Sequence, residues 1–120
     1  MRTKVAIIGA GSAGMRAYRE VGFGGVMRPD HVPVLKLFTP DANATWLITE
    51  IDPENPDLAF GLCDLGLGCP EIGSLSIAEV SGLRGALGLP VERDLHITLD
   101  QPLSVYADRA RAAGHIVTTF

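Results

Sequence analysis

The most constraining feature of the sequence is a run of short apolar segments separated by turns. The segments cover 34–39, 45–51, 58–65 and 71–76, and polar or glycine-rich stretches of five or six residues separate them. Alternation and β-branched residues make each segment a predicted strand. Parallel neighbours would need a crossover of about a dozen residues. Turns this short therefore predict an antiparallel meander.

Two helices are expected after the meander. Ser76 and Glu79 form a capping-box pattern, which predicts a helix over 77–87. A further strand is expected over 91–98. Asp100 is then positioned to cap a second helix, which Gly114 would end. The inner face of that helix is predicted to carry Leu103, Tyr106, Ala107 and Ala110.

These elements together predict an α+β fold. It consists of a small, mostly antiparallel sheet of four or five strands with two or three helices, preceded by an N-terminal strand–turn–helix. Residues 115–120 would add an edge strand or fray. Trp46, the one tryptophan, lies in the middle of a predicted strand and is expected in the core.

Glycines near the N-terminus have the spacing of a dinucleotide-binding turn. Gly9, Gly11 and Gly14 follow a predicted strand over 5–8 and precede a predicted helix over 14–21. In such a turn the glycines let the backbone approach a pyrophosphate, and the helix amides face the anion. Binding of ADP, FAD or NAD by these three glycines is therefore one hypothesis.

The residues behind this turn do not complete a cofactor site. An acidic residue for the ribose is expected about 20 positions further on, but Asp41 comes 27 residues after Gly14. Residues 1–21 resemble the N-terminus of flavoprotein disulfide reductases such as dihydrolipoamide dehydrogenase. The redox-active C-x-x-C of those enzymes is missing, because Cys63 and Cys69 are six positions apart. We therefore expect no FAD or NAD cofactor.

A second resemblance covers the body of the chain. Residues 33–97 are similar to a bacterial family known as domain of unknown function 2958. The motifs that carry it are Phe38-Thr39-Pro40, Trp46, Thr49-Glu50, Phe60-Gly61-Leu62, Glu71-Ile72-Gly73, Ser76, Arg84-Gly85 and LPVERDLHI. The resemblance implies a small domain of unknown activity, often encoded on plasmids and integrative elements beside antirestriction genes.

The N-terminal part departs from that family. Its members usually begin with a short helical segment containing L-T-x-E-L, which is replaced here by the flavoprotein-like start. This predicts a change of resemblance near residue 30. It also predicts an N-terminal segment over 1–28 and a small α+β domain over 29–120.

Polar residues of the body offer a candidate interaction cluster, namely Glu50, Glu71, Arg93, Asp94 and His96. On an extended strand, Asp94 and His96 would share one face with Glu92, and such a row could hold a divalent metal. In the simpler interpretation, Arg93 pairs with Glu50 or Glu71 across the sheet, and Asp94 and His96 bond to backbone in a loop. No metal and no catalytic residue are therefore assigned.

Charge and composition exclude several classes of function. A formal charge of −4 argues against a general nucleic-acid-binding protein, which needs a basic surface. The sequence shows no signal peptide and no apolar stretch long enough to cross a membrane, so a cytoplasmic location is expected. Cys63 and Cys69 are then expected to be reduced, buried thiols.

The function that remains is contact with another protein. We expect a non-enzymatic accessory protein of mobile-element type. The family's genomic setting suggests a specific version, in which the chain inhibits a host defence system as an anti-CRISPR or antirestriction factor. Nucleotide binding by the glycine turn is the alternative.

Overall fold

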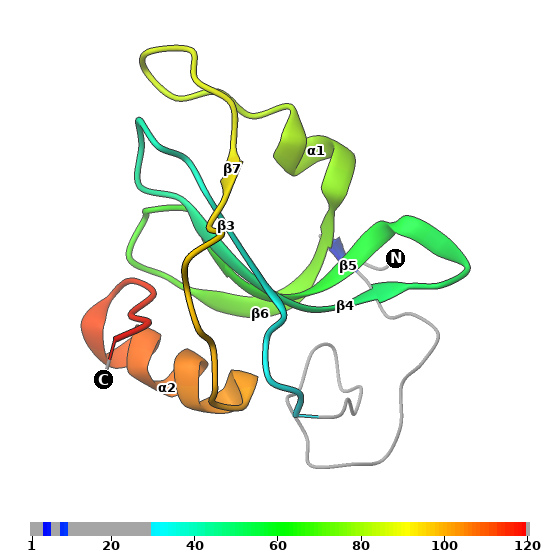
Figure 1. Cartoon of the computed structure of the whole chain (residues 1–120), viewed down its shortest axis with the longest axis vertical. Helices are drawn as coiled ribbons and strands as arrows, with labels where there is room; N and C mark the ends of the chain where they lie inside the picture. The colour runs from blue at the N-terminus through cyan, green and yellow to red at the C-terminus, as the bar shows by residue number, and fades with distance from the viewer. Residues whose placement is uncertain (1–3, 6–7, 10–29, 120) are drawn as a thin grey trace.

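The computed structural model describes residues 4–5, 8–9 and 30–119. They include a five-stranded antiparallel sheet in the order β6-β5-β4-β3-β7, and two helices (Figure 1). The predicted α+β class is confirmed. The elements are β3 (Leu35–Phe38), β4 (Thr45–Asp52), β5 (Asn55–Asp64), β6 (Glu71–Ser76), α1 (Ile77–Ser81), β7 (Glu92–Arg93) and α2 (Leu103–Ala113).

Near the N-terminus the structure describes two very short strands, β1 (Lys4–Val5) and β2 (Ile8–Gly9). They pair antiparallel, with Val5 opposite Ile8. The prediction of one continuous strand over 5–8 is therefore wrong, because its first and last residues face each other. Gly11, Gly14 and the predicted helix over 14–21 lie outside the described residues.

The sheet is covered on both faces, and one helix packs on each (Figure 1). On one face, Leu47 and Phe60 form a cluster with the buried side of α2. On the other face, Trp46 and Ile48 form a cluster that includes Val80 of α1. Adjacent residues of β4 thus enter opposite cores, as the alternation of side chains requires. Trp46 is 2% exposed, which confirms its predicted core position.

A β-bulge in β4 changes which face its last residues occupy. Ile48 pairs with Gly61 and Glu50 with Phe60, so Thr49 is the extra residue. The hydroxyl of Thr49 donates to the carbonyl oxygen of Phe60 (3.1 Å). Directly paired residues share a face, so Glu50 lies on the α2 side with Phe60. Strict alternation along the strand over 45–51 predicts that Glu50 shares a face of the sheet with Trp46. This prediction is wrong because of the bulge.

Helix α1 begins where the sequence predicts. The Ser76 hydroxyl accepts from the amide of Glu79 (3.2 Å). A second cap comes from the distant Asp57, whose carboxylate accepts from the Ser76 hydroxyl (2.7 Å) and from the Ala78 amide (2.7 Å). Asp57 therefore supplies an acceptor at the positive end of the helix.

The end of α1 differs from the prediction, because the helix stops at Ser81 rather than near Leu87. The amide of Gly82 closes the last turn by donating to the carbonyl of Ala78 (3.0 Å). The guanidinium of Arg84 then donates to the carbonyl of Ser81 (3.0 Å). These bonds satisfy carbonyl groups that would accept from later amides if the helix continued. The glycine-rich segment that follows forms a loop.

Replacing Asp57 with alanine is expected to lower the free energy of unfolding by about 1 kcal/mol at pH 7, since a helix cap is lost. The Ser76 hydroxyl, followed by the Ala78 amide, holds the pKa of Asp57 below its ordinary value. The stabilisation is therefore complete above about pH 4 and is lost as the pH falls through the lowered pKa. Urea unfolding at pH 7 and pH 3 measures this dependence.

The difference between wild type and Asp57→Ala should shrink at pH 3. Asp108→Ala is the control, because the Asp108 side chain is 75% exposed and pairs only with Arg111 one helical turn away. If Asp57→Ala lowers the free energy of unfolding by the same amount at both pH values, the ionised carboxylate of Asp57 is not the cap.

Helix α2 has a different N-terminal cap from the one predicted. Pro102 occupies the cap position and offers no side-chain hydrogen bond. The carboxylate of Asp30 instead accepts from the Ser104 amide (2.9 Å) and the Ser104 hydroxyl (2.6 Å). The predicted role of Asp100 as the N-cap is therefore wrong. The helix ends as expected at Gly114, whose φ of 82° suits glycine.

The two cysteines differ in exposure. Both are free thiols, and Cys63 of β5 is half-buried. Cys69 is exposed because it lies in the turn between β5 and β6, so the expectation that both thiols are buried is wrong. Within the described part of the chain, no helix is long and apolar enough to cross a bilayer.

Candidate functional site

The predicted polar cluster is not assembled. Glu71 is on β6 and Arg93 on β7, which are the two outer strands of the sheet. Arg93 pairs with Leu37, which is itself opposite Trp46, so it shares the α1 face. Glu50 lies on the other face with Phe60. The predicted pairing of Arg93 with either glutamate is therefore wrong, because the sheet lies between Arg93 and Glu50, and three strands lie between Arg93 and Glu71.

Asp94 and His96 lie beyond the end of β7, not on one strand with Glu92. The amide of Asp94 makes a last bond to the carbonyl of Lys36 (3.0 Å). Its carboxylate then accepts from the His96 amide (2.9 Å) and lies 3.6 Å from the Lys36 ammonium. The His96 amide, with a smaller contribution from Lys36, holds the pKa of Asp94 below its ordinary value.

This turn ends the predicted strand over 91–98 after only two residues. An aspartate that bonds to the amide two positions on reverses the chain. The described residues also contain no group of three His, Cys, Asp or Glu side chains arranged to hold a metal. The row of Glu92, Asp94 and His96 along one strand, on which the metal interpretation depended, is therefore not formed.

A different group of residues gathers at one end of the sheet. In an antiparallel meander, alternate turns lie at the same end, so the β3–β4 turn and the β5–β6 turn are neighbours (Figure 1). The loop after α1 reaches the same end. We call these three segments, 39–44, 65–70 and 82–91, the loop end.

Asp41, in the β3–β4 turn, holds the loop after α1 in place. One carboxylate oxygen accepts from the amides of Leu87 (2.7 Å) and Leu89 (3.2 Å). Burial alone would raise the pKa of Asp41, but the amides of Leu89 and Leu87 outweigh it and hold the pKa below its ordinary value. Gly85 packs directly against the same carboxylate. The loop therefore has its backbone turned inward to Asp41.

The side chains of these loops point outward, and many are leucines. The exposed leucines of the loop end are Leu65 (59%), Leu67 (79%), Leu83 (42%), Leu87 (78%) and Leu89 (40%). The only charged residue in 65–70 and 82–91 is Arg84. Its guanidinium is already bound to the carbonyls of Ser81 and Leu83. The loop end is therefore an apolar surface with little charge.

A hollow of about 490 Å³ opens beside the β3–β4 turn. Parts of the β3–β4 turn, the start of β4 and residues 114–116 line it, together with Lys36 and Asp64. Asp64 is 2% exposed, and its carboxylate accepts from the amides of Gly66 (2.8 Å) and Ile116 (2.9 Å). This buried carboxylate fixes the β5–β6 turn and the C-terminal residues to each other.

Comparison with known protein families identifies the family of this chain. A family model described as "Protein of unknown function (DUF2958)" matches residues 14–117. The chain belongs to this family. Comparisons with curated proteins and with solved structures gave no match for this chain.

The family match is longer than the predicted resemblance over 33–97. It begins at Gly14 and continues across residue 30, so the expected change of resemblance there is wrong. No comparison supports the flavoprotein resemblance of residues 1–21. Gly9 lies in β2 rather than in a turn, and Gly11 and Gly14 lie outside the described residues. The division into 1–28 and 29–120 stays a prediction.

Sequence reasoning missed Asp41, Asp64 and the exposed leucines. Asp41 bonds to amides 46 and 48 positions away, and Asp64 to one 52 positions away. No local pattern encodes such pairs. The one available signal was composition. The loop over 82–91 is rich in glycine and contains three leucines and one charged residue, which is unusually apolar for a surface segment.

Replacing Asp41 with alanine is expected to release the loop while the sheet stays folded. The amides of Leu87 and Leu89 should then exchange with solvent at least about tenfold faster, because each loses its acceptor. Hydrogen exchange followed by NMR measures this. Asp52→Ala is the matched control, since Asp52 caps only the Glu54 amide in the β4–β5 turn (2.8 Å). Equal protection of Leu87 and Leu89 in wild type and Asp41→Ala would contradict the assignment.

Proposed function

We propose that the DUF2958 domain acts by binding another protein through the loop end, and not by catalysis. The observation that carries this proposal is the presentation of five exposed leucines on loops whose backbones are held by buried or half-buried aspartates. Exposed apolar side chains that gather on neighbouring loops, rather than being scattered singly over the surface, mark an interaction site.

The chemistry of the loop end favours a protein over other partners. Interface cores are depleted in charge and rich in apolar side chains, and the single charge of 65–70 and 82–91 is used within the domain. A nucleic acid would instead require free cations to neutralise its phosphates. Loops that are ordered before binding also lose less conformational entropy when the partner docks.

The specific version of the proposal is that the partner is a complex of a host defence system. It rests on the genomic setting that the family resemblance implies, beside antirestriction genes on mobile elements. Such an inhibitor needs no active site, because it acts by covering a surface of the defence complex. The described loop end supplies a surface of that kind.

The test combines a binding panel with a variant of the loop end. Purified CRISPR effector complexes and restriction enzymes would be screened by biolayer interferometry and by phage-interference assays. We expect wild type to bind and inhibit at least one of them, and Leu67→Asp/Leu87→Asp to bind it at least about tenfold more weakly. Ile51→Asp is the control, since Ile51 is 47% exposed near the opposite end of β4.

Different outcomes test the identity of the partner and the position of the binding surface. If wild type binds none of the complexes and blocks none of them, the defence version is overturned. If a complex is bound equally by wild type and by the double variant, the loop end is not the binding surface. Loss of binding by Ile51→Asp as well would show an effect that is not local to the loop end.

We also propose that the domain works without FAD or NAD. Support comes from topology, because every described strand pair is antiparallel, whereas dinucleotide-binding folds use parallel strands with crossover helices. The melting temperature is expected to stay unchanged with ADP, FAD or NAD. A ligand at 100 times its Kd would add about 2.7 kcal/mol, so a rise of several degrees would contradict this and restore the glycine turn as a binding site.

A further inference from the structure

A second hollow lies at the opposite end of β3 from the loop end. It has a volume of about 440 Å³ and opens where the chain after β7 leaves β3. Apolar residues line two of its sides, 33–35 on one and Leu95, Ile97 and Leu99 on the other, and polar residues supply the rest of the lining. Val34 is 72% exposed and Leu95 is 74% exposed. The volume lies within the range of small-molecule sites.

The charges that line this hollow have a positive balance. Lys36 and Asp94 form an ion pair (3.6 Å), which leaves Arg93 as the third and last charged lining residue. The lining therefore carries a net charge of +1, on a chain whose formal charge is −4. A positive site on an acidic protein selects for an anion.

Arg93 stands out among the cations of residues 30–119. Lys36 pairs with Asp94, Arg84 binds helix carbonyls, and Arg111 pairs with Asp108. Arg109 also has an interaction partner. Within this range, only Arg93 has neither a hydrogen bond nor an ion pair, and it is exposed. Its guanidinium is thus available to bind a carboxylate through two parallel hydrogen bonds.

We propose that this hollow binds a small apolar carboxylate, with the anion on Arg93 and an aliphatic body against 33–35 and Leu95. The apolar walls bury the body, and the guanidinium supplies the charge and the hydrogen bonds. The Lys36–Asp94 pair keeps Asp94 from repelling the ligand. The site shares only Lys36 with the hollow at the loop end, so it does not depend on the proposed protein binding.

The probe for this proposal is octanoate, titrated into the ¹⁵N-labelled domain and followed by NMR. Octanoate should shift the amides of 34–36 and 94–99 in a saturable manner. Octanol, which has the body without the charge, and acetate, which has the charge without the body, should each bind at least about tenfold more weakly. Arg93→Gln should weaken octanoate binding at least tenfold, and Arg93→Lys less than that.

Arg111→Gln is the matched control, because Arg111 is an exposed arginine on α2 that does not line the hollow. It should bind octanoate as wild type does. The spectrum of each variant reports whether the fold is kept. The proposal is overturned if octanoate leaves 34–36 and 94–99 unshifted. It is also overturned if Arg93→Gln binds octanoate as tightly as wild type, or if octanol binds as tightly as octanoate.

Discussion

Replacing Gly61 with alanine is expected to destabilise the DUF2958 domain by about 3 kcal/mol or more. A Cβ atom added at Gly61 would overlap the carbonyl oxygen of Leu47. It would also lie 2.9 Å from the carbonyl carbon of Leu47 and 3.0 Å from the Cα of Ile48. All three are backbone atoms of β4, so no side-chain rotation can relieve the overlap. The two central strands would have to separate.

The position of Gly61 in the sheet makes this separation costly. It pairs with Ile48 beside the bulge at Thr49, between the two central strands. Leu62, beside Gly61, is fully buried in the cluster on the α2 side, and Ile48 is 1% exposed in the cluster on the α1 side, so both cores are anchored to this pair of strands. A shift of β4 would disturb the clusters on both faces together, because protein interiors are close-packed.

Urea unfolding measures the effect, and Gly82→Ala is the matched control. At Gly82 an added Cβ would meet its nearest atom, the Ala78 carbonyl oxygen, at 3.4 Å, and φ is −82°, which alanine adopts easily. Gly82→Ala should therefore remain within about 0.5 kcal/mol of wild type. A Gly61→Ala variant as stable as Gly82→Ala would show that the strands are not in such close contact.

The bulge at Thr49 also shows where prediction from sequence stops. The strand over 45–51 was predicted, and its alternation places Trp46 and Leu47 in opposite cores as observed. Alternation fails only after Thr49, where one extra residue moves Glu50 to the other face. Gly61, on the partner strand, lies against the backbone of Leu47 and Ile48 next to the bulge, and a pattern within one strand cannot reveal a requirement set by its neighbour.

The same limit applies to the ends of the helices and to the candidate site. Ser76 was predicted as a cap because its partner, Glu79, is three positions away. Asp30 caps α2 from 74 positions away, and Asp41 holds a loop 46 positions away. Local hydrogen bonds leave a pattern in the sequence, whereas these bonds exist only once the fold has brought the segments together. The bonds that hold the loop end together were therefore visible only in the structure.

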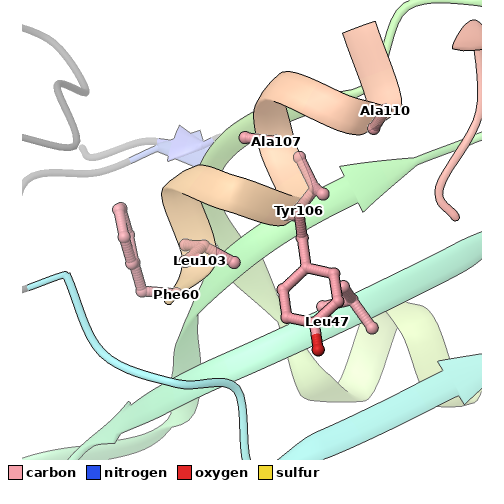
Figure 2. Packing of buried hydrophobic residues seen from close by; sticks show 7 residues of the cluster. Leu47, Phe60, Leu103, Tyr106, Ala107 and Ala110 are labelled. Carbon is pink, nitrogen blue, oxygen red and sulfur yellow. The ribbon is translucent and has the colours of Figure 1, made fainter. Parts of the chain in front are cut away.

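Replacing Tyr106 with alanine is the second change expected to have a large effect, a loss of about 3–5 kcal/mol in the free energy of unfolding. Tyr106 is 1% exposed and belongs to the cluster that joins α2 to Leu47 and Phe60 (Figure 2). On the same face of α2, Ala107 and Ala110 are completely buried, so the helix lies close to the sheet.

The hydroxyl of Tyr106 contributes separately, because it accepts from the amide of Asp100 (3.1 Å). Tyr106→Phe removes this bond and keeps the ring, so it should cost about 0.5–1.5 kcal/mol. Comparison of the two variants separates ring packing from hydrogen bonding. If Tyr106→Phe destabilises the domain as much as Tyr106→Ala, the ring is not the main contribution.

The same experiment asks whether the two faces of the sheet unfold together. Trp46 is the one tryptophan of the chain and lies in the cluster on the α1 side, so its fluorescence reports on the face away from α2. An isolated helix of 11 residues, the length of α2, is unstable in water. If α2 detaches first in Tyr106→Ala, circular dichroism will lose helix signal at a lower urea concentration than Trp46 fluorescence changes. We expect the two transitions to coincide, because Leu47 and Trp46 are adjacent in β4 and link both cores.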